Sequence, residues 1–278
     1  LDIIGVRNLV VVQNKIELVP REKVLENYNQ IKEFLAGTFA EDVPIIPVSA
    51  IHRANTDRLI QAIEEHIPTP RRDLTKPPRM YVARSFDVNR PGTRPEKLMG
   101  GVLGGVLLQG KLKLGDGIEL RPGIKVSREG KTTWQHLNSK TVSLHAMDSS
   151  LKEALPGGLV GVGTLLDPSM TKGDSLVGSV LGAPGTLPEV LDKLELEVHL
   201  MKRVVGLQKE LDVKPLVTGE PLMMNIGTSA TVGTITSARK DKATVKLKIP
   251  VCAELGARVA LSRRVGGRWR LIGYAIIT

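Results

Sequence analysis

The sequence predicts an α/β segment followed by two all-β units, and three observations support this fold class. Over residues 1–67, short apolar runs alternate with amphipathic helical patterns, as in a doubly wound parallel sheet. The proline-rich stretch IPTPRRDLTKPP at 67–78 has no apolar face and is typical of a linker. After Arg79, short β-rich runs are separated by glycine turns, which indicates closed barrels or sandwiches. We therefore expect an α/β domain at 1–70, a linker at 71–78, and β-barrels at 79–183 and 184–278.

The first segment shows two strand-helix repeats. NLVVVQNK is an apolar run that suits a buried parallel strand, and a helix is expected over REKVLENYNQIKEFLAG. Its apolar residues recur at helical spacing, and Gly37 suits the position after the helix. They are Val24, Tyr28, Ile31 and Leu35. VPIIPVSA predicts the second strand, and a second helix is expected to be capped by Asn55 or Thr56 and to stop before Pro68.

In the β-rich part, glycines and prolines indicate where turns separate the strands. Gly115-Asp116-Gly117 separates two alternating runs, as a hairpin turn would. GAPGTLPEV at 182–190 suggests a second hinge, after which alternating runs continue to the end of the sequence. Cys252, the sole cysteine, is expected to be a buried strand residue.

Composition narrows the class of protein. The 278 residues carry a net charge of +10, which favours an anionic partner, most commonly nucleic acid. One cysteine cannot form an internal disulfide, so a reducing, cytoplasmic setting is expected. We find no apolar run long enough to cross a membrane and no signal peptide pattern, and we expect no membrane partner.

The first strand ends in a pattern that is typical of guanine recognition. In an N-K-x-D motif, the Asn side chain bonds the base edge, the Lys stem packs on the base, and the carboxylate accepts from its N–H groups. Asn14 and Lys15 stand correctly, and Glu17 replaces the Asp with a carboxylate that is one methylene longer. The next strand ends in Ser49-Ala50-Ile51, matching the loop that closes over guanine with backbone N–H groups. Ordinary strand exits, which favour small and polar residues, are the alternative interpretation.

The catalytic half of a GTPase is not found in this sequence. Gly105 to Lys111 has P-loop spacing, but Leu112 follows where a Ser or Thr would hold Mg²⁺. EGKTT at 129–133 lacks the first glycine, and the D-x-x-G at 2–5 lies too close to Asn14 for a βαβ unit. Phosphoryl transfer depends on such elements, so we assign no catalytic residue. The five histidines show no metal-ligand spacing, and we predict no metal ligand.

Taken together, these stretches resemble the gamma subunit family of archaeal and eukaryotic translation initiation factor 2, along the whole chain. The resemblance is carried by VVVQNKIELV, PPRMYVARSFDVNRPGT, GGVLGGVL, PGGLVGVGTLLDP, LPEVLDKLELEVHLMKRVVG and RRVGGRWRLIGYAII. It extends more distantly to elongation factor Tu. It implies the second half of a P-loop GTPase domain followed by two β-barrels.

The resemblance also implies function and partners. The family binds GTP or GDP with Mg²⁺, hydrolyses GTP with an activating factor, and carries methionyl initiator tRNA to the small ribosomal subunit. It works as the core of a heterotrimer with alpha and beta subunits. Asn14, Lys15, Glu17 and Ser49 to Ile51 would then read guanine. Glu17 departs from the usual Asp, which puts affinity or specificity for guanine in question.

The same resemblance places tRNA contacts on both barrels. Arg84, Phe86 and Arg90 would approach the aminoacyl end, although barrel packing explains Phe86 equally well. In the second barrel the arginines around Trp269 suggest a phosphate-contacting surface, with Arg268 and Arg270 on the face opposite Trp269. That set comprises Arg263, Arg264, Arg268 and Arg270. Solvated edge-strand charges are the alternative for all four.

We expect this chain to be the C-terminal part of a longer translational GTPase. Without the phosphate-binding half, the isolated chain is expected to bind no GTP, to be inactive alone, and to be poorly folded before about residue 75. One alternative is a non-enzymatic β-barrel module that binds tRNA or the alpha subunit regardless of nucleotide. Another is a selenocysteine-specific elongation factor, which should carry a further RNA-binding extension.

Overall fold

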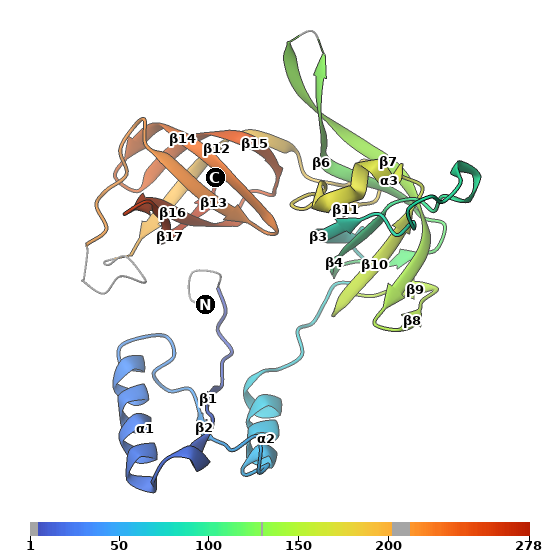
Figure 1. The fold of residues 1–278 in the computed structure, drawn as a ribbon. Helices are drawn as coiled ribbons and strands as arrows, with labels where there is room; N and C mark the ends of the chain where they lie inside the picture. The colour runs from blue at the N-terminus through green and yellow to red at the C-terminus, as the bar shows by residue number, and fades with distance from the viewer. Residues whose placement is uncertain (1–4, 129, 202–211) are drawn as a thin grey trace. The chain divides into compact units, whose positions relative to one another are not determined.

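The computed structural model describes residues 5–128, 130–201 and 212–278, and the chain divides into two compact units between Arg71 and Arg72. The first unit holds two helices and a short parallel sheet, and the second unit is all-β except for short helical turns (Figure 1). The predicted fold class, an α/β start followed by two β-barrels, is confirmed.

The first unit is built on two parallel strands, β1 (Val11–Gln13) and β2 (Ile45–Pro47). A 3-10 turn, η1 (Ile16–Leu18), and helix α1 (Arg21–Leu35) follow β1. The residues of the predicted apolar face of α1 are all half-buried, and Gly37 adopts φ 70° just after the helix, as expected. The helix therefore ends where its glycine permits a left-handed turn.

Helix α2 (Thr56–His66) begins after Asn55, but Asn55 does not cap it through its side chain. Asn55 adopts φ 59°, and its Nδ2 donates instead to the Pro47 carbonyl at 2.9 Å. The amide thus links the start of α2 to the end of β2. This link fixes the loop that contains Ser49 to Ile51.

The first barrel closes through a non-local strand pair. Its strand order is β10-β4-β3-β11-β6-β7, and β7 pairs back with β10. The strands are β3 (Arg79–Phe86), β4 (Val102–Gln109), β6 (Gly117–Arg128), β7 (Lys131–Ala146), β10 (Leu159–Thr164) and β11 (Val180–Gly182). Short pieces complete it: η2 (Pro95–Lys97), β5 (Leu112–Lys113), β8 (Ser149–Ser150), β9 (Glu153–Ala154), α3 (Pro168–Thr171) and η3 (Lys172–Asp174).

Two sequence patterns in this barrel have clear structural outcomes. Gly105 lies within strand β4, so the P-loop spacing there is a chance match, as expected. Gly115 to Gly117 do form a turn, in which Asp116 Oδ2 accepts from the Lys113 N–H at 2.8 Å. The flanking strands do not pair with each other, however, because β5 pairs with β9. The hairpin prediction at this turn is therefore wrong.

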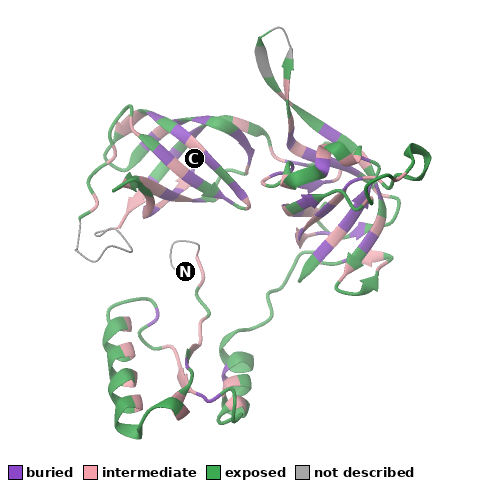
Figure 2. Ribbon diagram, viewed as in Figure 1, coloured by how far each residue is buried: buried purple, intermediate pink, exposed green. Residues whose placement is uncertain are grey.

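The second barrel is closed and entirely antiparallel, with strand order β12-β15-β14-β13-β16-β17 and a final pairing of β17 with β12. The strands are β12 (Val190–Leu200), β13 (Pro221–Ile226), β14 (Ser229–Arg239), β15 (Lys242–Cys252), β16 (Arg258–Val265) and β17 (Arg268–Ile277). Alternate residues point inward, so buried and exposed positions alternate along the strands (Figure 2). Cys252 ends β15 and is buried, as predicted.

The stretch at 182–190, predicted to be a hinge, connects the two barrels as a strap that hydrogen bonds attach to the first barrel. Buried Glu119 of the first barrel accepts from the Gly185 N–H at 2.8 Å and pairs with Arg121 at 2.7 Å. Arg121 in turn donates to the carbonyls of Leu187 and Pro188, both at 3.2 Å. These bonds hold the strap against the first barrel.

Burial raises the pKa of the Glu119 carboxyl, but the Gly185 N–H and the Arg121 guanidinium outweigh burial and bring the pKa below its ordinary value. The carboxylate is therefore ionised at neutral pH. On the other side of the strap, Cys252 donates its thiol to the Pro188 carbonyl at 3.3 Å. Burial raises the pKa of that thiol to about 11, so it is protonated at neutral pH.

No helix within the described ranges is long and apolar enough to cross a membrane.

Candidate functional site

The guanine motif lies at a corner of the first unit where two strand exits meet. Asn14 directly follows β1, and its Oδ1 accepts from the Lys15 N–H at 2.8 Å and from the Ala50 N–H at 3.3 Å. Lys15 adopts a left-handed conformation with φ 67°, which turns the chain into η1. The structure thus brings together the two loops that the sequence singles out.

Glu17 lies in η1, close to the second loop. The Ser49 hydroxyl beside it lowers the pKa of the Glu17 carboxyl, so this group is an anion at neutral pH. Ser49 is buried, and an antiparallel bridge to Ala54 holds its backbone. Within the described part of the chain, no hydrogen-bond donor reaches Oε2 of Glu17, although solvent does not reach that atom either. A shielded carboxylate oxygen without a donor suits a ligand that offers N–H groups.

Ile51 completes this corner as an exposed side chain, with 78% of its surface open to solvent. A cavity of about 330 Å³ lies beside the corner, between the strand exit and α1. Asn14 and Lys15 line this cavity, whereas Glu17 and the loop at 49–51 do not. The cavity therefore covers only part of the predicted base-reading set.

Gln13 is a residue of this corner that sequence reasoning missed. It is buried, and its Nε2 donates to the Val24 carbonyl and to Asn27 Oδ1, both at 2.9 Å. These bonds join the end of β1 to helix α1 and so position Asn14. The available signal was a polar residue at the end of an otherwise apolar strand.

A wide apolar groove of about 740 Å³ opens on the first barrel. It contains Phe86 at the end of β3 and Val102 at the start of β4, and its far wall comes from β7 and β10. Its other apolar side chains are partly exposed, and Ser143 and His145 supply polar groups. Those apolar side chains are Val88, Leu98, Met99, Val142 and Leu165.

The loop that forms one rim of the groove is held by Asn89. Its Nδ2 donates to the Met99 carbonyl at 2.7 Å, and its Oδ1 accepts from the Met99 N–H at 2.8 Å. This pair of bonds fixes Met99 beside the groove although the loop has little regular structure. On the opposite wall, Gly161 has no side chain and so leaves the groove open. A Cβ added there would meet His145 only at ordinary contact distance, so the position has room for a side chain.

The predicted tRNA-contacting residues of the first barrel differ in their surroundings. Phe86 lines the groove and is 39% exposed. Arg84 shares its face of β3, and its Nε donates to Asp174 Oδ1 at 3.0 Å, so Arg84 has a fixed position beside the groove. Arg90 is exposed on the rim loop.

The four predicted arginines of the second barrel do not share one face. In the β16–β17 ladder Arg263 lies opposite Arg270, whereas Arg264 lies opposite Trp269. Directly opposite residues share a face, so Arg264 is separated from the other three. Arg263 is mostly buried: it pairs with Glu220 and donates to the carbonyls of Lys214 and Pro215. Its guanidinium fixes the segment at 214–220.

The chain is similar to known proteins in both sequence and structure. The family model described as initiation factor eIF2 gamma, C terminal, matches residues 192–277. Translation initiation factor 2 subunit gamma of Methanothermobacter thermautotrophicus is 61% identical over 277 residues, which cover the whole chain and 68% of that protein. The corresponding subunit of Pyrococcus horikoshii is 60% identical, and that of Methanocaldococcus jannaschii is 58% identical, with the chain covering 67% of each.

Solved structures show the same architecture at low identity. A bacterial selenocysteine-specific elongation factor superposes with a TM-score of 0.75 at 20% identity, over 99% of this chain and 40% of that one. Elongation factor SelB from Methanococcus maripaludis, solved with a GTP analogue, gives 0.72 at 19% identity, over 96% of this chain and 58% of that one. This likeness establishes the fold alone.

Proposed function

Because the chain belongs to the family of translation initiation factor 2 gamma subunits, we propose that it takes part in GTP-dependent delivery of methionyl initiator tRNA to the small ribosomal subunit. The relatives are initiation factor subunits by name, and this chain is a translation initiation factor by family. The finer assignments below, to tRNA, guanine nucleotide and partner subunits, rest on the residues of the two sites.

The observation that carries the proposal is the apolar groove on the first barrel. A methionine ester presents an unbranched apolar side chain next to an adenosine, and both suit an apolar wall with a few polar groups. Phe86 offers a ring for stacking, and Ser143 and His145 offer hydrogen bonds at the far wall. Arg84 and Arg90 lie beside this end of the barrel, where backbone phosphates of the acceptor strand would pass.

We assign recognition of the guanine base to the corner in the first unit. Asn14 and the amide groups of the 49–51 loop would contact the base edge, and the Lys15 stem would pack on its face. Glu17 would accept from the ring N–H and the exocyclic amine, which would satisfy its unpaired Oε2. Bound GTP with Mg²⁺ would supply the hydrolysable phosphate, and to this chain we assign only reading of the base.

In the second barrel, we propose unequal roles for the four predicted arginines. Arg264 and Arg268 are exposed and stay proposed phosphate contacts on opposite faces of the β16–β17 ladder. Arg270 is partly buried, and Arg263 is engaged with Glu220, so these two have a smaller proposed role. The alpha subunit is proposed to dock on the first barrel, with the beta subunit and the GTPase-activating factor acting at the GTPase domain.

A groove-filling variant of the full-length protein tests the tRNA proposal. Gly161→Leu places a side chain into the groove without a backbone clash. Burial of a methionine side chain is worth about 2 kcal/mol, so loss of that contact should weaken binding of methionylated initiator tRNA about 30-fold. Binding of the deacylated tRNA should change little. Met147→Gln, at a fully exposed position outside the groove, is the matched control.

Two results would contradict the proposal. Equal losses for charged and deacylated tRNA would show that the groove does not hold the aminoacyl end. Binding that is the same with GTP and GDP would favour the alternative, a β-barrel module without a nucleotide role. Asn14→Ala and Glu17→Ala should each remove the difference between the two nucleotides while leaving the groove intact.

A further inference from the structure

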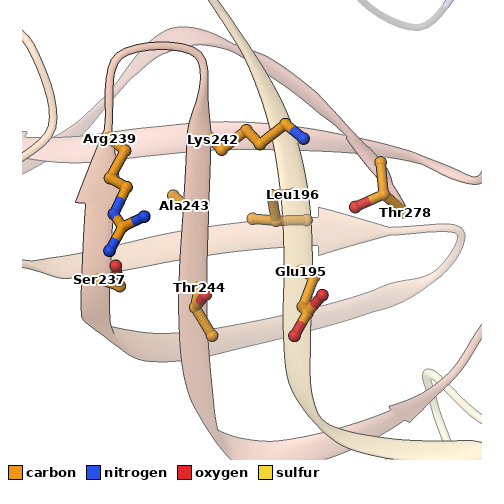
Figure 3. Close-up of a pocket in the computed structure, with 8 residues that line it drawn as sticks. All are labelled: Glu195, Leu196, Ser237, Arg239, Lys242, Ala243, Thr244 and Thr278. Atoms are coloured by element: carbon orange, nitrogen blue, oxygen red, sulfur yellow. The ribbon is translucent and has the colours of Figure 1, made fainter.

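A polar pocket on the second barrel lies apart from both sites described above. Its volume is about 310 Å³, and it spans three adjacent strands, β14, β15 and β12. Figure 3 shows Arg239 and Lys242 on the two arms of a hairpin, with Ser237 and Thr244 further along these arms and Glu195 on the neighbouring strand β12. Thr278 and the backbone around Leu196 and Ala243 complete the wall.

The strand register explains why these side chains converge. Ser237 pairs with Thr244, which also pairs with Glu195, so the three form one row across the sheet. Arg239 pairs with Lys242 in the next row. A β-bulge between Ile235 and Ser237 shifts the register of β14, and Ala238 packs toward the core. Ser237 and Arg239 consequently point outward together.

The charges on this face are unevenly compensated. Asp192 pairs with Lys246, and Glu195 lies 3.6 Å from Lys193. Glu197 lies opposite Lys242 in the ladder, with its carboxylate 3.1 Å from the His199 ring, and Asp241 lies in the hairpin turn beside Lys242. Among the described residues, by contrast, neither Arg239 nor Lys242 forms an ion pair. In the part of the chain that the structure describes, the pocket therefore has two cations without an ion-pair partner at its rim, and Glu195 and three hydroxyl groups in its wall.

We propose that this pocket binds one phosphate of an RNA backbone together with its ribose. Arg239 and Lys242 would hold the phosphate oxygens, and the hydroxyls of Ser237 and Thr244 would donate to them. Glu195 is an exposed carboxylate in the same row, 3.6 Å from Lys193, and it suits the ribose 2′-hydroxyl that distinguishes RNA from DNA. The site uses none of the residues assigned to the groove or the guanine corner.

An acidic peptide is the competing occupant for such a cationic pocket. A carboxylate could occupy the position of the phosphate, and backbone N–H groups of a peptide could donate to Glu195, so polyglutamate serves as the peptide probe in the test. The volume of about 310 Å³ also exceeds what a single carboxylate requires and accommodates a sugar phosphate. The overall charge of +10 favours a polyanion with regularly spaced charges.

The test measures the affinity of the full-length protein for a labelled single-stranded RNA of mixed sequence across a range of salt concentrations. The double variant Arg239→Gln/Lys242→Gln removes both cations that hold the one phosphate. The slope of log affinity against log salt concentration should fall in magnitude by about 0.7, the value for one neutralised phosphate of a single strand, and binding should be about tenfold weaker at moderate salt. Lys240→Gln, in the same hairpin but outside the pocket, removes one exposed charge and should leave both quantities nearly unchanged.

Two further measurements test the hydrogen bonds of the pocket. Ser237→Ala keeps every charge and should weaken RNA binding about threefold. Wild-type protein should bind the RNA more tightly than DNA of the same sequence, and Glu195→Ala should remove that preference. Thermal unfolding of each variant shows whether its barrel is intact, and Ser237→Ala tests the pocket even if the double variant fails to fold.

Three results would overturn the proposal. The double variant could bind RNA with wild-type affinity and salt dependence. Lys240→Gln could lose as much RNA affinity per removed charge as the double variant does, which would indicate non-specific electrostatic attraction rather than a defined binding site. Polyglutamate binding could be lost while RNA binding is retained, which would identify an acidic peptide site. Because the probe is not a tRNA, failure of the groove proposal would leave this test unaffected.

Discussion

The two compact units of this chain bury their apolar side chains to very different extents. In the two barrels, clusters of fully buried residues fill each interior, and the six main strands of each barrel are paired on both edges. In the first unit the described buried hydrophobic residues are small, namely Ala40, Val48 and Ala62. Large apolar side chains such as Phe34 and Ile60 are mostly exposed there.

The difference shows how sheet closure determines self-sufficiency. A closed barrel satisfies its own backbone groups and encloses its own core, so its stability depends on local and cross-strand contacts within it. Two parallel strands of three residues each leave their outer edges unpaired and enclose little. We therefore expect the barrels to provide most of the unfolding free energy, and the first unit to open at low cost.

The largest effect is expected from a cavity in a barrel core. Leu222→Ala, at a fully buried position of β13, should lower the free energy of unfolding by about 2–5 kcal/mol. Urea unfolding followed by far-UV circular dichroism measures it. The matched control Leu255→Ala, at a 75% exposed position, should change the value by less than about 0.5 kcal/mol. Equal effects would show that the barrel interior is not the main source of stability.

A smaller loss is expected from the strap between the barrels. Glu119→Gln removes a buried charge that pairs with Arg121 and accepts from Gly185. Breaking such a pair costs about 3–5 kcal/mol when both groups are buried. Arg121 keeps some contact with solvent, so we expect about 2–3 kcal/mol, measured by the same urea titration. A loss of unfolding free energy below about 0.5 kcal/mol would show that the ion pair between Glu119 and Arg121 contributes little to stability.

The same carboxyl gives a pH dependence with a definite sign. Its pKa in the folded protein lies below the ordinary value of 4.5, so its contribution to stability is present above pH 4.5 and is lost as pH falls through the folded pKa. Wild-type Tm should therefore fall more steeply below pH 4.5 than the Tm of Glu119→Gln. Parallel curves for the two proteins would contradict this role of Glu119.

In the first unit we expect a modest and local effect from Gln13→Ala. The change removes two hydrogen bonds between β1 and α1, worth about 1–2 kcal/mol together. Hydrogen exchange should accelerate in β1, α1 and the loop at 49–51, with no change in the barrel strands. Glu33→Ala, at an exposed position of α1, is the control. Faster exchange in the barrels would show that the two units unfold together.

The smallest effect is expected at Phe34, whose surface is 82% exposed. Phe34→Ser should change the free energy of unfolding of this chain by less than about 0.5 kcal/mol. Urea titration of the 278-residue chain and of the full-length protein would sharpen the comparison. A larger loss in the full-length protein alone would show that further protein covers this side of α1.

The elements that depend on local pattern could be predicted from the sequence. Apolar runs, helical spacing and Gly37 located β1, β2 and α1, because each signal lies within a few residues of the element it defines. The change to alternating patterns after Arg79 indicated the barrels for the same reason. The turn at Gly115 was located, but its strand pairing was not, because β5 pairs with a strand about forty residues further along.

For the candidate sites too, the sequence predicted some features and only the tertiary structure decided the others. The sequence alone identified the two loops of the guanine corner and the presence of Phe86 and the arginines. Only the tertiary structure decided that Asn14 contacts Ala50, that Arg263 is engaged with Glu220, and that Arg239 and Lys242 border a pocket. Residue types follow from the sequence directly, whereas their neighbours depend on strand register and barrel closure. Strand register and barrel closure depend on contacts between segments that are distant in the sequence, and a local sequence pattern does not predict such contacts.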